Sequence, residues 1–151
     1  MKEFQLVSFS EEFLDLSWTW LNDPLVAKLT NTPIFSKEDQ KKWFHSLHEN
    51  ENYRIWGVIF NDQKIGACGL KNITQNDCEY WGYIGEKSFW NKGIGTMILN
   101  NIISIAKKDN LESIWLNVLY LNKNAIHLYE KLGFKIEGPK KTKIIKMRLY
   151  V

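Results

Sequence analysis

Hydrophobic and polar positions in the first half of the chain repeat with two different periods. Four segments alternate at every second residue, which is the period of a β-strand with one buried face. Two segments between the first and second of these repeat with the period of an amphipathic helix. The predicted strands are residues 4–9, 53–60, 65–70 and 77–84, and the predicted helices are residues 10–22 and 36–50.

Polar residues and prolines mark the ends of the two helices. The segment Asn22-Asp23-Pro24 predicts the end of the first helix. Turn residues at 31–33 (Asn-Thr-Pro) predict that the connection up to Phe35 is a loop. Ser36 begins the second helix and Asp39 follows three residues later, a spacing typical of a capping box.

The second half of the chain changes to a strand–helix alternation. It predicts a helix with an apolar face at residues 94–106, a strand at 113–119, a helix from Asn122 that ends at Gly133, and a strand at 143–151 paired with a short strand near Phe134. A helix between the fourth and fifth strands forces those two strands to run parallel. The sequence therefore predicts an α/β (α+β) fold, with a mixed, mostly antiparallel sheet of seven strands, one parallel pair and four helices.

Residues 92–96 (Lys-Gly-Ile-Gly-Thr) lie between the fourth strand and the helix that follows it. Glycines let the backbone turn sharply and approach a ligand, and the free N–H groups of a helix start bind phosphate. A P-loop is excluded because Lys92 precedes both glycines, and a dinucleotide fingerprint is excluded because Ile98 stands where a small residue is needed. A phosphate or pyrophosphate site and an ordinary strand–helix turn both remain open.

Composition and charge narrow the classes of function. The 151 residues are most simply one domain over residues 1–151, and a formal net charge of +3 is too small to indicate nucleic acid but suits an anionic ligand. No apolar run reaches the roughly 18 residues of a membrane span, and the N-terminus does not resemble a signal peptide. Cys68 and Cys78 match no metal-binding spacing, so we expect reduced thiols, no metal and a cytoplasmic protein.

Two motifs together resemble a known family. The first is the loop at 92–95 between a strand and a helix, and the second is residues 122–134 (Asn-x-x-Ala-x-x-Leu-Tyr-Glu-Lys-Leu-Gly-Phe). In this order they resemble the GCN5-related N-acetyltransferases (GNAT), over nearly the whole chain. Trp90 stands where many members have Gln or Arg, and an aromatic residue there is similar to the branch with the ribosomal-protein N-terminal acetyltransferases, which also includes several small-molecule enzymes.

The resemblance implies acetyl-coenzyme A as the donor and a primary amine as the acceptor. The loop at 92–96 would hold the pyrophosphate, and the strand at 79–84 would bind the pantetheine amides like an added strand. Gly82 would mark a bulge that separates this strand from its neighbour. The implied coenzyme-binding residues are Tyr83, Ile84, Lys92, Gly93, Ile94, Gly95, Thr96, Asn122 and Ala125.

Two residues are candidates for the acid–base chemistry of acetyl transfer. Glu79 matches a position where relatives often carry a catalytic glutamate, and it would take the proton of the amine. Tyr129 lies two helical turns after Asn122 and would give a proton to the leaving thiolate. A backbone N–H near Tyr83 or Ile84 would polarise the thioester carbonyl. The structural alternatives are a solvated or lysine-paired Glu79 and a packed Tyr129.

The acceptor is the least determined part of the site. Trp18, Trp20 and Trp81 are candidates for an aromatic acceptor wall, although all three also suit the core. The segments at 18–24 and 78–80 resemble amino-sugar N-acetyltransferases, so we expect a small amine such as a nucleotide-linked amino sugar, bound by a monomer or homodimer.

Two other functions stay open, a protein N-terminal acetyltransferase and a non-catalytic coenzyme-A-binding sensor. Polyamines and aminoglycosides would need an acidic wall. Asp23 is the only acid at 22–35, which argues against them.

Overall fold

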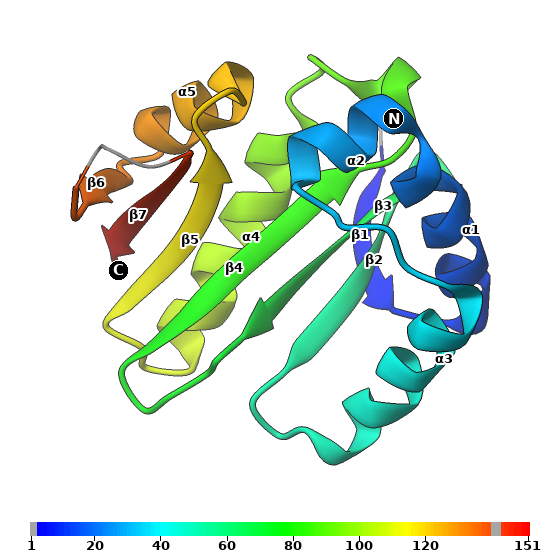
Figure 1. Ribbon diagram of the computed structural model, residues 1–151. Helices are drawn as coiled ribbons and strands as arrows, with labels where there is room; N and C mark the ends of the chain where they lie inside the picture. Colours follow the sequence, from blue (N-terminus) through cyan, green and yellow to red (C-terminus); the bar gives the residue numbers. More distant parts are fainter. Residues whose placement is uncertain (1–2, 140–142) are drawn as a thin grey trace.

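The computed structural model describes residues 3–139 and 143–151 and contains a seven-stranded sheet in the order β1-β2-β3-β4-β5-β7-β6 (Figure 1). All neighbouring strands are antiparallel except β4 and β5, which are parallel. The strands are β1 (Phe4–Ser8), β2 (Arg54–Phe60), β3 (Gln63–Lys71), β4 (Asp77–Ile84), β5 (Ser113–Leu119), β6 (Lys135–Glu137) and β7 (Ile144–Tyr150). The predicted mixed sheet with one parallel pair is confirmed.

In the described ranges five α-helices accompany the sheet, one more than predicted. They are α1 (Glu11–Asn22), α2 (Pro24–Thr30), α3 (Lys37–Ser46), α4 (Ile94–Lys108) and α5 (Lys123–Lys131), and short 3₁₀ helices lie at Leu47–Glu49 and Lys87–Phe89. Figure 1 shows α1, α2 and α3 on one face of the sheet and α4 on the other. None of the helices in the described ranges is long and apolar enough to cross a membrane.

The additional helix is α2, which lies where the sequence predicted a loop. Its N-cap is Asp23, whose carboxylate accepts hydrogen bonds from the N–H groups of Leu25 and Val26, and Pro24 occupies its first position. The helix ends at Asn31, whose φ of 53° is left-handed. The segment Asn22-Asp23-Pro24 therefore ends one helix and begins the next, and α2 is too short for its periodicity to be recognised.

The core is centred on the apolar face of α4. Its buried residues pack against the sheet because they recur every three to four positions along the helix. The residues of α4 in this core are Ile94, Ile98, Leu99, Ile102 and Ala106, and the fully buried partners from the strands include Ile65, Leu70, Ile114, Leu116 and Met147. The helix predicted from its periodicity is thus the main packing element of this face.

The parallel strands β4 and β5 pair over a short length and then separate. In the described sheet their ladder covers Asp77–Glu79 against Ser113–Trp115. The predicted bulge at Gly82 is wrong, because β4 pairs with β3 in regular register through that residue. The register shift recorded between β2 and β3 lies instead at Val58/Ile59. The gap between β4 and β5 therefore opens without a bulge in β4.

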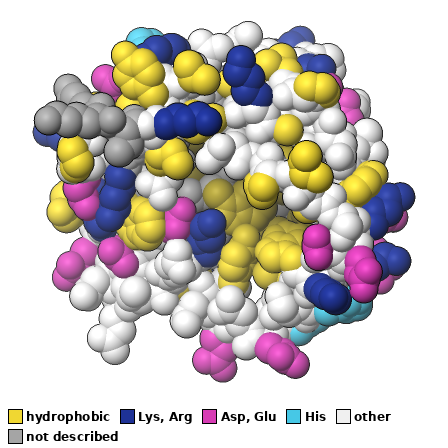
Figure 2. Space-filling view, viewed as in Figure 1, with side chains coloured by type: hydrophobic (Ala, Val, Ile, Leu, Met, Phe, Trp, Pro, Cys, Tyr) yellow, Lys and Arg dark blue, Asp and Glu magenta, His cyan; other side chains and the backbone are white. Residues whose placement is uncertain are grey.

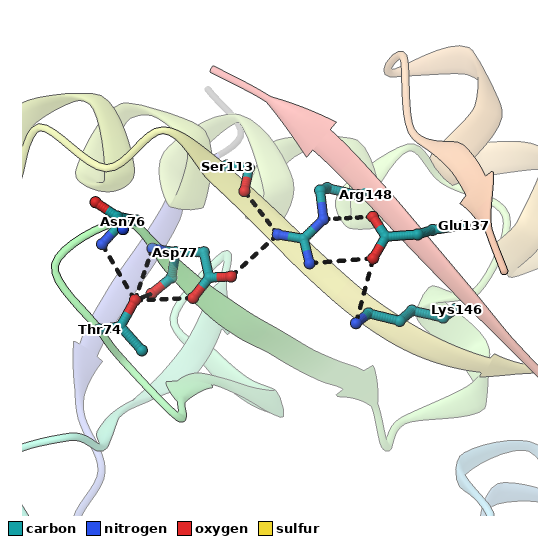
Figure 3. Close-up of polar contacts among 7 residues, drawn as sticks. All are labelled: Thr74, Asn76, Asp77, Ser113, Glu137, Lys146 and Arg148. Atoms are coloured by element: carbon teal, nitrogen blue, oxygen red, sulfur yellow. Dashed lines mark hydrogen bonds and ion pairs between the residues drawn. The ribbon is translucent and has the colours of Figure 1, made fainter.

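A polar network joins four strands at the closed end of this gap (Figure 3). The guanidinium of Arg148 donates to both carboxylate oxygens of Glu137 (2.5 and 3.2 Å), to Asp77 Oδ2 (3.1 Å) and to Ser113 Oγ (2.7 Å). Asp77 in turn accepts from the hydroxyl of Thr74 in the preceding turn (2.9 Å). Because these residues come from β4, β5, β6 and β7, the network holds the strands together at the end where β4 and β5 are still paired.

We expect Arg148→Met to destabilise the fold by about 1–3 kcal/mol, because two carboxylates lose charge-assisted hydrogen bonds. The hydrogen bond from Arg148 lowers the pKa of Glu137 below its ordinary value of 4.5. This stabilisation is present above pH 4.5 and is lost as the pH falls through the lowered pKa, so the deficit of the variant shrinks in acid. Urea unfolding between pH 3 and 7 measures it. Arg54→Met removes an exposed pair with Asp109 and is the control, with an expected change of about 0–1 kcal/mol. An equal effect of both variants would contradict the prediction.

Candidate active site between β4 and β5

A cleft of about 1020 Å³ opens where β4 and β5 separate. Figure 2 shows hydrophobic side chains in a hollow near the centre of this face. Twelve predicted site residues line it: Glu79, Trp81, Tyr83, Ile84, Lys92, Gly93, Ile94, Gly95, Thr96, Asn122, Ala125 and Tyr129. Trp18 and Trp20 are not among the described residues of the lining.

The loop before α4 has the backbone geometry of an anion site. Asn91 and Gly93 have left-handed φ angles of 60° and 78°. Among the described residues no side chain caps the start of α4, and no intrahelical or side-chain partner is found for the N–H groups of its first turn. The indole of Trp90 donates to the C=O of Ile84 (2.8 Å) and ties the loop to the end of β4. The aromatic residue in place of Gln or Arg therefore stabilises the loop.

Hydrogen bonds at the two ends of β4 establish which backbone groups face the gap. The C=O of Asn76 accepts from the segment that enters β5 (2.7 Å), whereas the N–H of Gly85 donates to a β3 carbonyl (2.7 Å). Successive residues of a strand direct their backbone polar groups to opposite sides. The N–H groups of Gly82 and Ile84 therefore face the gap, and that of Tyr83 faces β3. Beyond the paired residues, the C=O of Ile84 on this edge accepts from Trp90, and no partner is found among the described residues for the N–H groups of Gly82 and Ile84.

Glu79 is the last residue of β4 that pairs with β5, opposite Trp115. It is buried, with 8% of its surface exposed. Its Oε1 accepts from Asn72 Nδ2 (2.8 Å), and Lys71 Nζ lies 3.9 Å from Oε2. The lysine pairing considered as an alternative is therefore present, but it is long and leaves the carboxylate on the wall of the cleft.

Tyr129 reaches the same cleft from α5, beside Tyr80 and Phe134. Burial raises the pKa of Tyr129 from 10.0 to about 12, so the phenol is protonated at neutral pH and is able to donate a proton. Glu79 lies on the face of the sheet that carries α1–α3, whereas Tyr129 packs with the core on the α4 side. Both side chains line the same cleft because the gap between β4 and β5 is open to both faces of the sheet.

Asn122 connects α5 to α2 across the cleft. Its Oδ1 caps α5 by accepting from the N–H of Ala125 (3.3 Å), and its Nδ2 donates to the C=O of Leu29 (3.4 Å). Both ends of the side-chain amide are therefore used within the protein. This residue, predicted to contact a ligand, holds two walls of the cleft in place.

The aromatic wall of the cleft differs from the one expected. Trp81 stacks with Tyr83 (6.3 Å between centroids) and is followed by Tyr53 and Trp43, all of which line the cleft. Trp20 instead packs beside Tyr83, with 4% of its surface exposed and its indole donating to Glu86 (2.8 Å).

Trp18 packs edge-on against Phe35. The structure thus gives Trp18 and Trp20 packing positions. Sequence reasoning missed Tyr53 and Trp43 as residues of the cleft. Trp43 lies on α3 and Tyr53 directly precedes β2, and both come near Trp81 only through the packing of α3 on the sheet.

A comparison with protein-family models matches residues 14–134 to the acetyltransferase (GNAT) family. The chain belongs to the GNAT family. It is therefore an acetyltransferase by family. The matched range contains the loop before α4, Glu79 and Tyr129, so the motif-based prediction is confirmed.

Known proteins of this family cover most of the chain. Acetyltransferase PseH of Campylobacter jejuni is 26% identical over 137 residues, which is 90% of this chain and 84% of that protein. A crystal structure of that enzyme in complex with acetyl coenzyme A has a TM-score of 0.76 at 21% identity, covering 98% of this chain and 99% of that chain.

Two further relatives differ from PseH in their names. N-alpha-acetyltransferase 50 of Danio rerio is 37% identical over 119 residues, or 76% of this chain and 70% of that protein. Spermidine N-acetyltransferase of Vibrio cholerae, crystallised with CoA and spermine, has a TM-score of 0.85 at 21% identity and covers 97% of this chain and 95% of that chain. The structural similarities establish a shared GNAT fold.

A second phenol in this GNAT site had no role in the sequence analysis. Tyr80 is buried on β4 with its ring edge-on to Tyr129, 6.5 Å between centroids. Its hydroxyl lies over the α-carbon of Gly82, because a Cβ added there would be 2.2 Å from Tyr80 Oη. Gly82 is thus required for the close approach of this phenol, and not for a bulge.

We expect Gly82→Ala to lower the free energy of unfolding by about 1–3 kcal/mol, since the methyl group overpacks against Tyr80. The displaced phenol would enter the gap and weaken binding of coenzyme A. Urea unfolding and calorimetric titration measure the two effects. Gly138→Ala is a control for coenzyme binding only, because Gly138 lies outside the cleft but has a positive φ (86°), which Gly82 does not share and which strains an alanine. Unchanged coenzyme binding in Gly82→Ala would contradict this account of the gap.

Proposed function

We propose that residues 1–151 form one catalytic domain that transfers an acetyl group from acetyl-CoA to a primary amine in a ternary complex. The observation that carries this proposal is the gap between β4 and β5. It has a free backbone edge, an uncapped helix start at one end, and Glu79 and Tyr129 on opposite walls. The acetyl coenzyme A complex of PseH supports the choice of donor.

The residues around the gap fit the chemical groups of coenzyme A. The free N–H groups of Ile94, Gly95 and Thr96, with Lys92 beside them, suit a pyrophosphate. The backbone groups of Gly82 that face the gap suit the amides of a pantetheine arm. Nothing in the described lining requires a strand to move aside first, because the gap is already open.

The side chains divide the proton transfers between them. When bound, acetyl-CoA supplies a thioester, whose carbonyl carbon the neutral amine attacks. Glu79 accepts the proton lost by the amine, and the N–H of Ile84 stabilises the negative charge that develops on the carbonyl oxygen. As the carbon–sulfur bond breaks, Tyr129 gives its phenolic proton to the thiolate and is reprotonated from solvent.

Charge and aromatic content favour a small, flat-faced acceptor. Trp81, Tyr83, Tyr53 and Trp43 give the α1–α3 side of the cleft an aromatic surface that suits the apolar face of a sugar ring. With the sequence resemblance at 18–24 and 78–80, this supports an amino sugar, preferably linked to a nucleotide.

A polyamine fits the same surface poorly. Among the described residues of the lining, the carboxylates are Asp39 and Glu79. Asp39 caps α3, and its hydrogen bonds with Ser36 lower its pKa. Glu79 is partly balanced by Lys71. A polycation would find two acids here, one engaged in the capping box of α3 and one near a lysine, unlike a site built for several ammonium groups.

A peptide N-terminus is the second candidate acceptor, because the Danio rerio relative named N-alpha-acetyltransferase 50 is 37% identical. Incubation with acetyl-CoA and four amines separates the candidates: a nucleotide-linked amino sugar, the free amino sugar, spermidine and a short peptide. We expect release of free thiol, and a mass increase of the acceptor, with the nucleotide-linked sugar first. Reaction with the peptide or spermidine alone would overturn the acceptor. Coenzyme binding without thiol release from any amine would overturn the catalytic proposal in favour of a sensor.

A further inference from the structure

The turn after β3 brings a side-chain amide onto the carboxylate of Glu79. Asn72 follows the last residue of β3 and has a left-handed φ of 50°. Its Nδ2 donates to Glu79 Oε1 at 2.8 Å, which is a well-formed hydrogen bond. Among the residues that the structure describes, no other hydrogen bond to the Glu79 side chain is found. One oxygen of the carboxylate is therefore held by the protein.

The second oxygen has a different environment. Lys71 stands directly opposite Glu79 in the β3–β4 ladder, and its Nζ lies 3.9 Å from Oε2. That separation is beyond hydrogen-bond distance, and no hydrogen bond to Oε2 is found among the described residues. Glu79 lines the cleft, and the hydrogen bond from Asn72 to Oε1 restricts rotation of its carboxylate.

We propose that Asn72 is a positioning residue for the base of acetyl transfer. The inference rests on the proposed function of Glu79. Asn72 orients the carboxylate so that Oε2 receives the proton of the acceptor amine.

The left-handed conformation alone does not account for this contact. Asn31, Asn61, Asn91 and Asn110 also have φ angles between 49° and 60°, and none of them bonds to Glu79. Asparagine tolerates this conformation, so the turn explains the residue type. It does not explain why the amide of Asn72 is directed back onto β4.

Two substitutions separate the amide from the backbone conformation. Asn72→Gly keeps the left-handed turn and removes the donor, whereas Asn72→Asp keeps the size and replaces the donor by a second carboxylate. Asn110→Gly is the matched control, because Asn110 has the same conformation (φ 59°), is exposed, and lies outside the cleft. The readouts are kcat, the KM for the amine, coenzyme affinity and Tm.

For Asn72→Gly we expect kcat to fall roughly tenfold while the KM for the amine changes little. The loss of kcat is larger in Asn72→Asp, because a like charge replaces the donor beside the carboxylate. Coenzyme affinity stays at the wild-type value in both variants, and Asn110→Gly keeps the wild-type kcat. In a Glu79→Gln background, Asn72→Gly has no further effect, since the two residues act through one carboxylate.

A wild-type kcat in both Asn72 variants, with a lower Tm, would make Asn72 a turn residue only and would overturn the proposal. The proposal would also be overturned if Asn72→Gly lowered kcat by the same factor in the wild type and in the Glu79→Gln variant. The proposed function fails separately, through absence of acetyl transfer by the wild-type protein or through full activity of Glu79→Gln.

Discussion

Glu79→Gln lowers kcat for acetyl transfer by about 10²–10⁴-fold at neutral pH, the range expected when a general base is removed. The amide of Gln cannot accept the proton of the amine, although it fills nearly the same space beside Asn72. Coenzyme affinity is unchanged, because Glu79 lies on the α1–α3 side of the gap and the coenzyme loop lies at the start of α4.

Single-turnover rates, calorimetric titration with coenzyme A and an unfolding curve test this result together. Glu86→Gln is a control for loss of a carboxylate that bonds to a nearby aromatic residue, since Glu86 accepts from the Trp20 indole outside the cleft. It keeps kcat near the wild-type value. A rate for Glu79→Gln within about threefold of the wild type would remove Glu79 from the chemistry, because loss of a base costs far more.

Tyr129→Phe lowers kcat by about 10²-fold or more, because the thiolate then leaves without a proton donor. The removal of one hydroxyl leaves the contacts with Tyr80 and Phe134 in place. Tyr80→Phe is the matched control. The ring centroid of this second phenol lies 6.5 Å from that of Tyr129, and Tyr80 also lines the cleft and is buried over Gly82. The ratio of the two losses measures which phenol gives the proton, and a larger loss in Tyr80→Phe would transfer the role to Tyr80.

The pH dependence gives an independent test of Tyr129. Its pKa is raised from 10.0 to about 12 by burial. The protonated phenol therefore stabilises the fold fully below pH 10, and this contribution is lost as the pH rises through 12. We expect no fall in kcat that is due to Tyr129 below pH 10. An alkaline limb near pH 8 that disappears in Tyr129→Phe would contradict the assignment.

The elements around the site follow closely from local pattern. The strand at 77–84 and the helix that begins at Ile94 were predicted from the spacing of their hydrophobic residues. That spacing does not depend on tertiary contacts, because alternate residues of a strand and every third or fourth residue of a helix share a face. Gly133 was predicted to end α5. It has a φ of 101°, and its N–H bonds to Glu130 as in a C-terminal cap.

Other features depend on contacts between segments far apart in the chain. The helix α2 has only seven residues, which are too few to show a helical periodicity in the sequence. It is stabilised by the cap at Asp23 and by the hydrogen bond from Asn122 of α5. Trp20 and Trp81 look alike in a sequence, yet one is buried beside Glu86 and the other lines the cleft. Hydrophobicity measures the tendency to leave water and does not tell a core position from the wall of a pocket.

The sequence by itself determined the order of strands and helices, the parallel pair and the glycine loop at a helix start, since each depends on residues close in the chain. The two candidate proton carriers came from the resemblance to the family and stay predictions. The tertiary structure decided that β4 and β5 separate after Glu79, that Asn72 holds one oxygen of that carboxylate, and that Tyr53 and Trp43 join Trp81. These facts depend on strand register and on helix packing across the sheet. Both are set by many weak contacts over long separations, which no short pattern of residues encodes.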